Sequence, residues 1–319
     1  RPRIGRRLRD PEEDLERSGL HGPLGQRHGF QAGVAMGRVT DSQVTGSQLT
    51  GLQSTGSRLT RRGLWRWLAA SGLMLTIPSR STAAASHWPD ERTAGPFVFH
   101  ADFSLDDIGT FVLDLANLQT TLASDLNVPE ASEPIHVFLF QRKATYQSYL
   151  KHFFPTVSAR RAMYIKQRGP GMVFAYRHPD LSIDVRHEST HALLHAVLPR
   201  VPLWLDEGLA EYYEVEPGDR LTHEPYLTTV RKQIGEGVDF RLETLERLPD
   251  LNSMGAEEYR HAWAWVHFLL HGPPPAKDSL RSFLFDSAAK TGSSPLSQRL
   301  RLALPEYPQR FLDHFRADF

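Results

Sequence analysis

Residues 186–214 read R-H-E-S-T-H-A-L-L-H-A-V-L-P-R-V-P-L-W-L-D-E-G-L-A-E-Y-Y-E. They begin with an H-E-x-x-H pattern, in which His187 and His191 are four residues apart. Residues at this spacing lie on one face of an α-helix, so both imidazoles can reach one metal ion. Glu188 lies one step round the helix, where it can reach a metal-bound water and act as a general base. The stretch therefore predicts a metal-binding helix.

A second acidic pattern follows after a short break. Residues 190–198 are apolar enough to form a buried helix, and two nearby prolines end it. Residues 204–214 then predict a second short helix, which carries Glu207 and Glu211 four residues apart. Hydrolytic zinc sites take three protein ligands and leave one position open for water, and two His with one Glu form a known set. Glu207 completes this set with the two histidines.

Two residues restrict the identity of the third ligand. A histidine ligand in H-E-x-x-H-x-x-G-x-x-H requires Gly and His where this chain has Leu194 and Val197, so that arrangement is excluded. His195 extends the stripe of His187 and His191 by one turn, but three ligands are already assigned. We therefore expect His195 to pack or to cap the helix. The alternative for the whole set is that His187 and His191 are ordinary surface or core histidines.

The motifs on both predicted helices resemble those of a group of zinc peptidases. Residues 204–210, W-L-D-E-G-L-A, resemble the W-L-N-E-G-F-A segment of zinc aminopeptidases in the gluzincin group, whose third ligand is a Glu on the following helix. Together, H-E-x-T-H-A-L-L-H and W-L-x-E-G-L-A-E-Y resemble the peptidase MA-like domain of bacterial proteins. Only 15 residues separate His191 from Glu207, fewer than in the aminopeptidases, so we expect a reduced cleft wall and an intact ligand set.

This resemblance implies a zinc metallopeptidase, a hydrolase that binds Zn2+ in a thermolysin-like zincin fold. It implies that His187, His191 and Glu207 are the metal ligands and that Glu188 is the general base. It also implies that Glu211 orients His187, as an acidic residue four positions after the ligand does in thermolysin-like enzymes. The alternative for Glu211 is an ordinary carboxylate that faces solvent on a short helix.

Residues 259–270, Y-R-H-A-W-A-W-V-H-F-L-L, predict a further apolar helix. The run resembles the Y-E-K-G-x-x-x-L-x-x-L helix of the zinc aminopeptidases, with Ala262 in place of the Gly. The Tyr hydroxyl of those enzymes stabilises the tetrahedral oxyanion, which implies the same catalytic role for Tyr259. The alternative is an aromatic core helix, and the other candidates for this role are then His223, His261 and His267.

Residues 171–176, G-M-V-F-A-Y, predict a strand that ends about ten residues before the H-E-x-x-H motif. In gluzincins a strand in this place lines the cleft and pairs with the substrate backbone. The aminopeptidases carry G-x-M-E-N there, and its Glu grips the free N-terminus of the substrate. This chain lacks that Glu, which puts an aminopeptidase specificity in doubt.

Strand and helix patterns alternate before the motif, and helical patterns follow it. Apolar residues predict strands at 97–100 and 135–140, and helical spacing predicts helices at 106–126 and 143–154, the first capped by Ser104. After residue 215 the predicted elements are all helices: 225–234, 240–248, 259–270, 279–289 and 296–315. The pattern predicts an α+β fold with a small, mostly antiparallel sheet, then the active-site helix and a helical C-terminal half.

Charge is unevenly distributed along the 319 residues. Residues 1–86 hold 13 Arg, no Lys and 6 acidic residues, so the rest of a chain with zero net charge is acidic. A mildly acidic domain gives no reason to expect nucleic acid as a partner, and the expected partner is a peptide or protein substrate. The chain contains no Cys, which excludes disulfides and thiolate metal sites.

The N-terminal 86 residues divide into two segments. Residues 1–60 are rich in Arg, Gly and small polar residues, which predicts a disordered low-complexity extension. Residues 61–86 begin with two Arg, continue with about ten apolar residues and end in small residues, the layout of a signal peptide cleaved near Ser86. This run is too short to span a bilayer, which takes about 20 residues. We therefore expect an exported protein, periplasmic or extracellular, with a peptidase MA-like zinc-binding domain at 87–319.

Two other functions are compatible with these residues. A zinc-binding scaffold or binding protein of the same fold would keep the ligands without turnover. The presence of Glu188 argues against it, because a purely structural site does not need a general base. The other is a globular protein without metal, in which the histidines are incidental.

Overall fold

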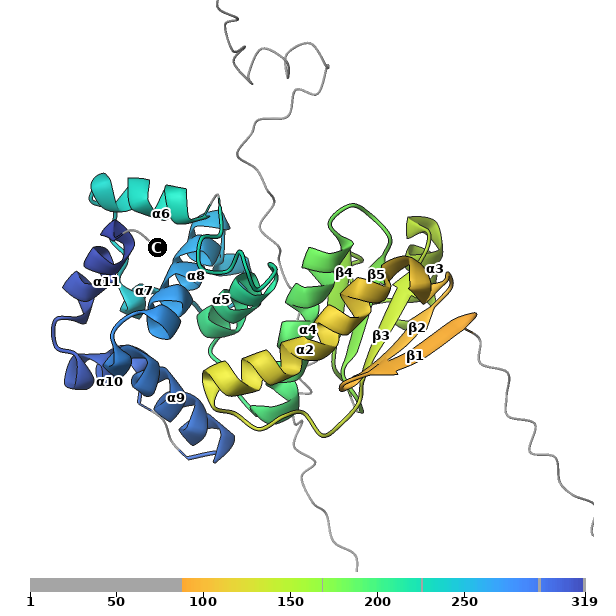
Figure 1. Ribbon diagram of the computed structural model, residues 1–319, viewed down its shortest axis with the longest axis horizontal. Coiled ribbons are helices and arrows are strands. Elements are labelled where there is room, and N and C mark those ends of the chain that lie inside the picture. Colours follow the sequence, from red (N-terminus) through yellow and green to blue (C-terminus); the bar gives the residue numbers. More distant parts are fainter. Residues whose placement is uncertain (1–87, 168, 225, 292–293, 318–319) are drawn as a thin grey trace, which may run out of the picture. The chain divides into compact units, whose positions relative to one another are not determined.

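A computed structural model of the chain describes residues 88–319 except 168, 225, 292–293 and 318–319 (Figure 1). These residues belong to one compact unit. The predicted low-complexity extension at 1–60 and the predicted signal peptide at 61–86 lie outside the described residues. Within the described part of the chain, no helix combines the length and apolar character needed to cross a membrane.

Five strands form one sheet in the order β1–β2–β3–β5–β4: β1 (Asp90–Ala94), β2 (Phe97–Ala101), β3 (Ile135–Phe140), β4 (Ala162–Ile165) and β5 (Met172–Tyr176). The β1–β2 and β4–β5 pairs are antiparallel, whereas β2–β3 and β3–β5 are parallel. The expectation of a mostly antiparallel sheet was therefore wrong, because a helical crossover after β2, and another after β3, returns the chain for parallel pairing.

Helices make up most of the remaining described chain (Figure 1). They are α2 (Gly109–Leu126), α3 (Lys143–Phe153), α4 (Leu181–Val197), α5 (Leu203–Tyr213), α6 (Tyr226–Gly235), α7 (Leu242–Glu246), α8 (Ala256–His271), α9 (Pro274–Ala288), α10 (Leu296–Ala303) and α11 (Tyr307–Arg316), with short 3-10 helices at Leu105–Ile108 and Leu251–Ser253. The predicted α+β class with a helical C-terminal half is confirmed. The single helix predicted at 296–315 is instead two helices. Leu304 is not helical there because Pro305, which follows it, disfavours the helical conformation.

Alternating side chains give the sheet two different faces. Phe99, Val137 and Val173 are buried in the larger core, which also contains the apolar side chains of α2 and α4. Phe140 and Phe174 point to the opposite face, where they form a smaller aromatic cluster with residues of α3. α4 contacts β4 and β5, so the helix with the H-E-x-x-H motif lies directly against one end of the sheet.

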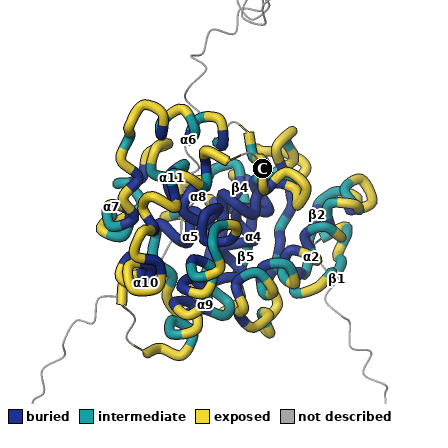
Figure 2. The backbone as a smooth tube through the Cα atoms, turned by 60° about the vertical axis from the view of Figure 1, so that its left-hand side comes forward, coloured by how far each residue is buried: buried dark blue, intermediate teal, exposed yellow. Residues whose placement is uncertain are grey.

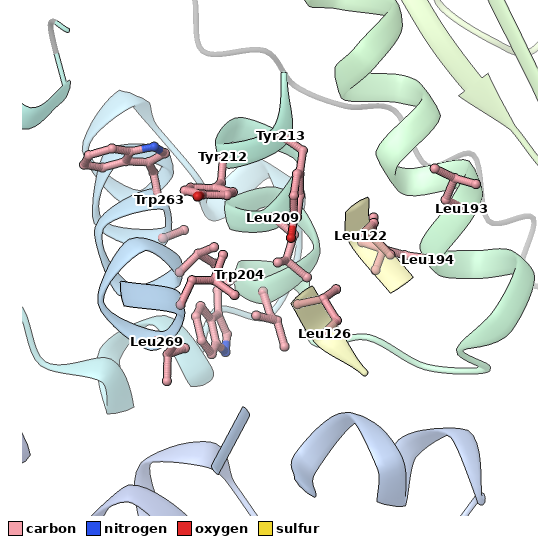
Figure 3. Close-up of a cluster of buried hydrophobic side chains, with 14 of the residues drawn as sticks. Leu122, Leu126, Leu193, Leu194, Trp204, Leu209, Tyr212, Tyr213, Trp263 and Leu269 are labelled. Carbon is pink, nitrogen blue, oxygen red and sulfur yellow. The ribbon is translucent and has the colours of Figure 1, made fainter. Parts of the chain in front are cut away.

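The packing of α5 on α8 brings the C-terminal half against the motif. These two helices have the most extensive contact between any two described elements, and Figure 2 shows them with α4 in the buried centre. Gly208 makes this approach possible, because a Cβ at this position would lie 2.7 Å from the carbonyl oxygen of Ala262. Trp204 and Leu209 of α5 and Leu269 of α8 belong to the same cluster of buried apolar side chains (Figure 3).

Two strands were missed in the sequence. β1 reads D-E-R-T-A, which is too polar to resemble a strand, and it lies at an edge of the sheet. β4 has only four residues, A-M-Y-I, all buried, so no alternation marks it. β4 is nevertheless the other edge strand, and it contacts the motif helix as extensively as β5 does.

Candidate metal centre

α4 and α5 are buried on nearly all sides, although both carry ionisable residues. His187, Glu188 and His191 on α4 and Glu207 and Glu211 on α5 are each at most 2% exposed. A buried ionisable group is strongly destabilising unless a hydrogen bond, an opposite charge or a metal ion compensates it. The contacts of each residue therefore indicate what this buried centre is built to hold.

Three potential ligand atoms converge between the two helices. Nε2 of His187 lies 3.3 Å from Nε2 of His191, and Oε2 of Glu207 lies 3.7 and 3.8 Å from these two nitrogens. Metal bonds of about 2.0–2.2 Å in tetrahedral geometry separate neighbouring ligand atoms by roughly 3.3–3.6 Å. The three residues predicted as metal ligands are thus brought together, and they could hold one metal ion.

Both imidazoles turn their second nitrogen to a carboxylate. Nδ1 of His187 lies 3.0 Å from Oε2 of Glu214, and Nδ1 of His191 lies 3.0 Å from Oδ1 of Asp206. A carboxylate in this position keeps the proton on Nδ1, so Nε2 carries a lone pair. In the neutral tautomer the two Nε2 lone pairs then face each other and the Glu207 carboxylate, an arrangement that is repulsive unless a proton or a metal ion lies between them.

The electrostatics of the centre agree with this requirement. Burial alone would lower the pKa of His187, but its contacts with Glu207 and Glu214 raise it well above the ordinary value. Burial raises the pKa of Glu207, against the opposing charge of His191. Neither carboxylate oxygen of Glu207 has a hydrogen-bond partner among the described residues. A bound cation would satisfy these oxygens, so the residues present fit a metal ion.

Glu214 makes the contact with His187 that was expected of Glu211. The chain keeps a helical conformation through Glu214, which places its carboxylate two turns after Glu207 on the same side of α5. Glu214 therefore reaches Nδ1 of His187. Ligand atoms of His187, Glu211 and Glu214 lie within 4.8 Å of one another, and the role predicted for Glu211 stays a prediction. Glu211 accepts a hydrogen bond of 2.8 Å from the hydroxyl of Tyr226. Burial and then the charge of Glu214 raise the pKa of Glu211 to about 8, which favours its neutral form.

Asp206 contacts the predicted ligand His191, and the sequence reasoning did not single it out. Its two carboxylate oxygens lie 3.0 Å from Nδ1 of His191 and 3.0 Å from Nε2 of His195. Burial would raise the pKa of Asp206, but His191 and His195 hold it well below its usual range. His195 is thus a partner of Asp206 and not a ligand, as expected. The one sequence signal for this contact was the position of Asp206, an acidic residue directly before the predicted ligand Glu207.

Glu188 is held by the edge strand of the sheet. Its Oε2 accepts a hydrogen bond of 2.7 Å from the main-chain N–H of Tyr164 in β4. The strand predicted to line the cleft was β5, but β5 has β3 on one side and β4 on the other. An inner strand cannot pair with a further chain, and the edge strand beside Glu188 is β4, whose four residues are all buried.

Tyr259 lies on the first turns of α8 with its hydroxyl buried and without a hydrogen-bond partner among the described residues. Burial and then the charges of Glu207 and Glu211 raise its pKa well above the usual range, so the hydroxyl keeps its proton. Of the alternatives, His267 is bonded to His314 and to the carbonyl of Leu221. The hydroxyl of Tyr259 is therefore a donor close to the predicted ligand Glu207.

The remaining alternatives to Tyr259 make other contacts. His261 packs against the ring of Phe240, with ring centroids 4.1 Å apart, and His223 packs against Tyr226 and Trp263.

A second tyrosine, Tyr146, is a further candidate for a hydroxyl donor near Glu188. The hydroxyl of Tyr146 on α3 is buried without a hydrogen-bond partner, and after burial the largest effect on its pKa comes from Glu188. No sequence signal marked Tyr146, because it belongs to an ordinary amphipathic pattern.

Comparison of the chain with protein-family models gives no match, and comparison with curated proteins gives none either. The function must therefore be argued from the residues and geometry of the buried centre.

Proposed function

We propose that this chain is a zinc-dependent peptidase of the gluzincin type. One observation carries the proposal: Nε2 of His187, Nε2 of His191 and the carboxylate of Glu207 converge in a buried site, and neither oxygen of Glu207 has a hydrogen-bond partner among the described residues. Two imidazoles and one carboxylate are a ligand set of catalytic zinc, which keeps a fourth position for water. A glutamate adjacent to the first ligand is what separates a hydrolytic site from a structural one.

Zinc bound there would polarise the scissile carbonyl and lower the pKa of a bound water toward about 7. The chain's own residues then perform the proton transfers. Glu188 takes the proton of the attacking water and gives it to the leaving amine. The N–H of Tyr164 donates to one oxygen of Glu188, which fixes the carboxylate and leaves the other oxygen for the proton.

Glu214 and Asp206 hold the two histidines in the tautomer that presents Nε2. Tyr259 is the proposed donor to the oxyanion that forms when the carbonyl is attacked. Its buried hydroxyl has no other acceptor among the described residues, and burial keeps its proton in place.

The proposed substrate is a peptide in an extended conformation. β4 pairs only with β5 among the described strands. Its four residues are buried, so a peptide that adds to its outer edge would have to displace the groups that cover it. This edge is also where the N–H of Tyr164 meets Glu188, so a peptide paired there would pass the general base. We further propose that the protein acts after export, on the basis of the signal-like sequence of residues 61–86.

The test combines metal analysis of the purified chain with a cleavage assay on a broad peptide library. We expect one zinc per chain, cleavage that a chelator abolishes, and recovery of cleavage when zinc is added back. A chain that holds zinc but cleaves nothing would support the scaffold alternative. If the purified chain holds no metal, both the peptidase proposal and the scaffold alternative are wrong.

A further inference from the structure

A small pocket lies outside the metal centre, between α2, α4 and the loop that follows α5. Its volume is about 80 Å3, and its lining includes Asp114, Asn117 and Thr121 from α2, Arg186 from α4 and Arg220 from the loop. A buried water needs roughly 10–15 Å3 by the same measure of volume, so the pocket has room for a group of several oxygen atoms.

Two guanidinium groups from different elements line this pocket, and both residues are more than nine-tenths buried. Arg186 is 4% exposed and Arg220 is 6% exposed. An arginine keeps its charge at any pH that a protein tolerates. Two buried cations at one pocket repel each other and have lost their hydration, so each needs an anionic partner.

Arg186 has such partners. Its Nη2 donates to the carboxylate of Asp114 at 2.5 Å and lies 3.6 Å from Glu216. Its guanidinium also lies over the ring of Phe111, 5.6 Å from the centroid. The side chain of Glu216 is 69% exposed, so it does little to neutralise the interior of the pocket.

Arg220 lacks a carboxylate partner. Its one hydrogen bond to a described residue runs from Nε to the main-chain carbonyl of Val215, at 3.2 Å. The guanidinium lies 4.9 Å from the centroid of the Tyr213 ring, and it forms none of the ion pairs of the described residues. Burial lowers the pKa of Arg220, the charge of Asp125 acts against this, and the charge of Arg186 lowers the pKa further. The terminal nitrogens of Arg220 are therefore donors at the pocket without an acceptor among the described residues.

We propose that this pocket is a binding site for a small oxyanion of the size of phosphate or sulfate, held between Arg186 and Arg220. Guanidinium groups match the geometry of such anions, because neighbouring N–H groups can donate to two oxygens at once. The exposed amide of Asn117 lies at the same pocket and can donate a further hydrogen bond.

An anion in this pocket would connect three parts of the fold. Arg186 belongs to α4, Asn117 to α2, and Arg220 to the loop that begins directly after Glu214. The bound anion would thus fasten the loop to the two helices and stabilise the folded chain. This inference does not depend on the proposed peptidase function, because it requires neither zinc nor turnover.

The test measures thermal unfolding of the full chain at increasing phosphate or sulfate, with sodium chloride holding the ionic strength constant. We expect a saturable rise in Tm of roughly 5–10 °C when the anion reaches about a hundred times its Kd. Sulfate and phosphate also stabilise proteins without a site, but that effect rises with concentration and does not saturate. Isothermal titration with each anion gives the stoichiometry, expected to be one per chain.

Arg220→Gln removes the cation and should abolish the saturable rise, whereas Arg310→Gln, an exposed arginine on α11, should retain it. Asn117→Asp keeps the fold, because the residue is exposed, and should abolish binding by placing a negative charge at the pocket. If Arg220→Gln does not fold, Asn117→Asp decides alone. An equal saturable rise in wild type and Asn117→Asp, or no saturable rise in wild type, would overturn the proposal.

Discussion

The carboxylate of Glu214 lies 3.0 Å from Nδ1 of His187, seven residues after the proposed ligand Glu207 on the same side of α5. This contact fixes the proton on Nδ1 and leaves Nε2 to face His191 and Glu207. One short helix therefore supplies a ligand and also the group that orients another ligand. Of the two glutamates that follow Glu207, Glu214 contacts Nδ1 of His187 and Glu211 contacts the hydroxyl of Tyr226. Their substitution should therefore affect metal binding differently, which can be tested.

Glu214→Gln should weaken zinc binding by about 10- to 100-fold, because His187 loses the charged partner that orients it and increases its basicity. Glu211→Gln is the matched control. Burial and the charge of Glu214 raise the pKa of Glu211 to about 8, which favours its neutral form, and the amide replaces that form. Competition with a chromogenic chelator at pH 7 measures both affinities. Equal losses in the two variants would contradict the assignment of Glu214.

His191→Ala should remove stoichiometric zinc and lower the Tm of the chain. The remaining ligands, His187 and Glu207, are fully buried and would lose the cation that compensates them. Elemental analysis of the purified variant gives the stoichiometry, and His152→Ala, an exposed histidine, is the control. One zinc per chain in the His191→Ala protein would show that the ligand set is wrong.

Glu188→Gln should retain zinc and the fold but lose peptide hydrolysis, because the amide cannot take up the proton of the attacking water. The substitution is nearly isosteric and can still accept the hydrogen bond from Tyr164. Turnover of a cleaved library peptide is compared in the two proteins at equal zinc content. If the variant turns over as fast as the wild type, Glu188 is not the base.

Tyr259→Phe should lower kcat by about 100- to 1,000-fold with little change in KM, which is the usual effect of removing one oxyanion donor. The core-packing alternative predicts a change in stability of about 1 kcal/mol and an unchanged kcat. Tyr307→Phe, whose hydroxyl bonds Glu243 far along the chain from the motif, is the control for loss of a buried hydroxyl. An unchanged kcat in Tyr259→Phe would direct attention to Tyr146.

The chain should lose stability in mild acid through a histidine pair far from the proposed ligands in sequence. Burial lowers the pKa of His267 to about 3 and that of His314 to about 4, and Nδ1 of His267 lies 2.9 Å from Nε2 of His314. A folded-state pKa below the unfolded value of about 6.5 means that the unfolded chain binds more protons. The contribution is therefore fully present above pH 6.5 and is lost as pH falls toward 4 and 3.

Denaturant unfolding between pH 7 and pH 4 checks this sign. Each of the two histidines should contribute up to about 1.4 kcal/mol per pH unit to the slope of the unfolding free energy below pH 6.5. His314→Gln should reduce the slope, whereas His152→Gln should leave it unchanged. A slope that is equal in wild type and His314→Gln would contradict the prediction.

The local features of this protein could be predicted from its sequence. The H-E-x-x-H motif predicted that His187 and His191 converge, because helical spacing fixes which side chains share a face. The Glu on the next short helix, Glu207, was the predicted third residue of the set. Apolar runs predicted β3 at its observed bounds, and the order of strands and helices predicted the α+β class.

The remaining features depend on how the elements pack. The mixed sheet and the place of β4 at its edge follow from crossovers and pairing that no local pattern encodes, and β4 itself is too short to show periodicity. Which glutamate reaches Nδ1 of His187 depends on how α5 packs between α4 and α8, and Gly208 allows the close approach to Ala262 of α8. Arg186 and Arg220 are 34 positions apart in sequence and meet at one pocket only through the fold. Spacing along a helix determines which residues face the same way, whereas the choice of partner depends on distances between elements, and these are determined by the packing of the whole core.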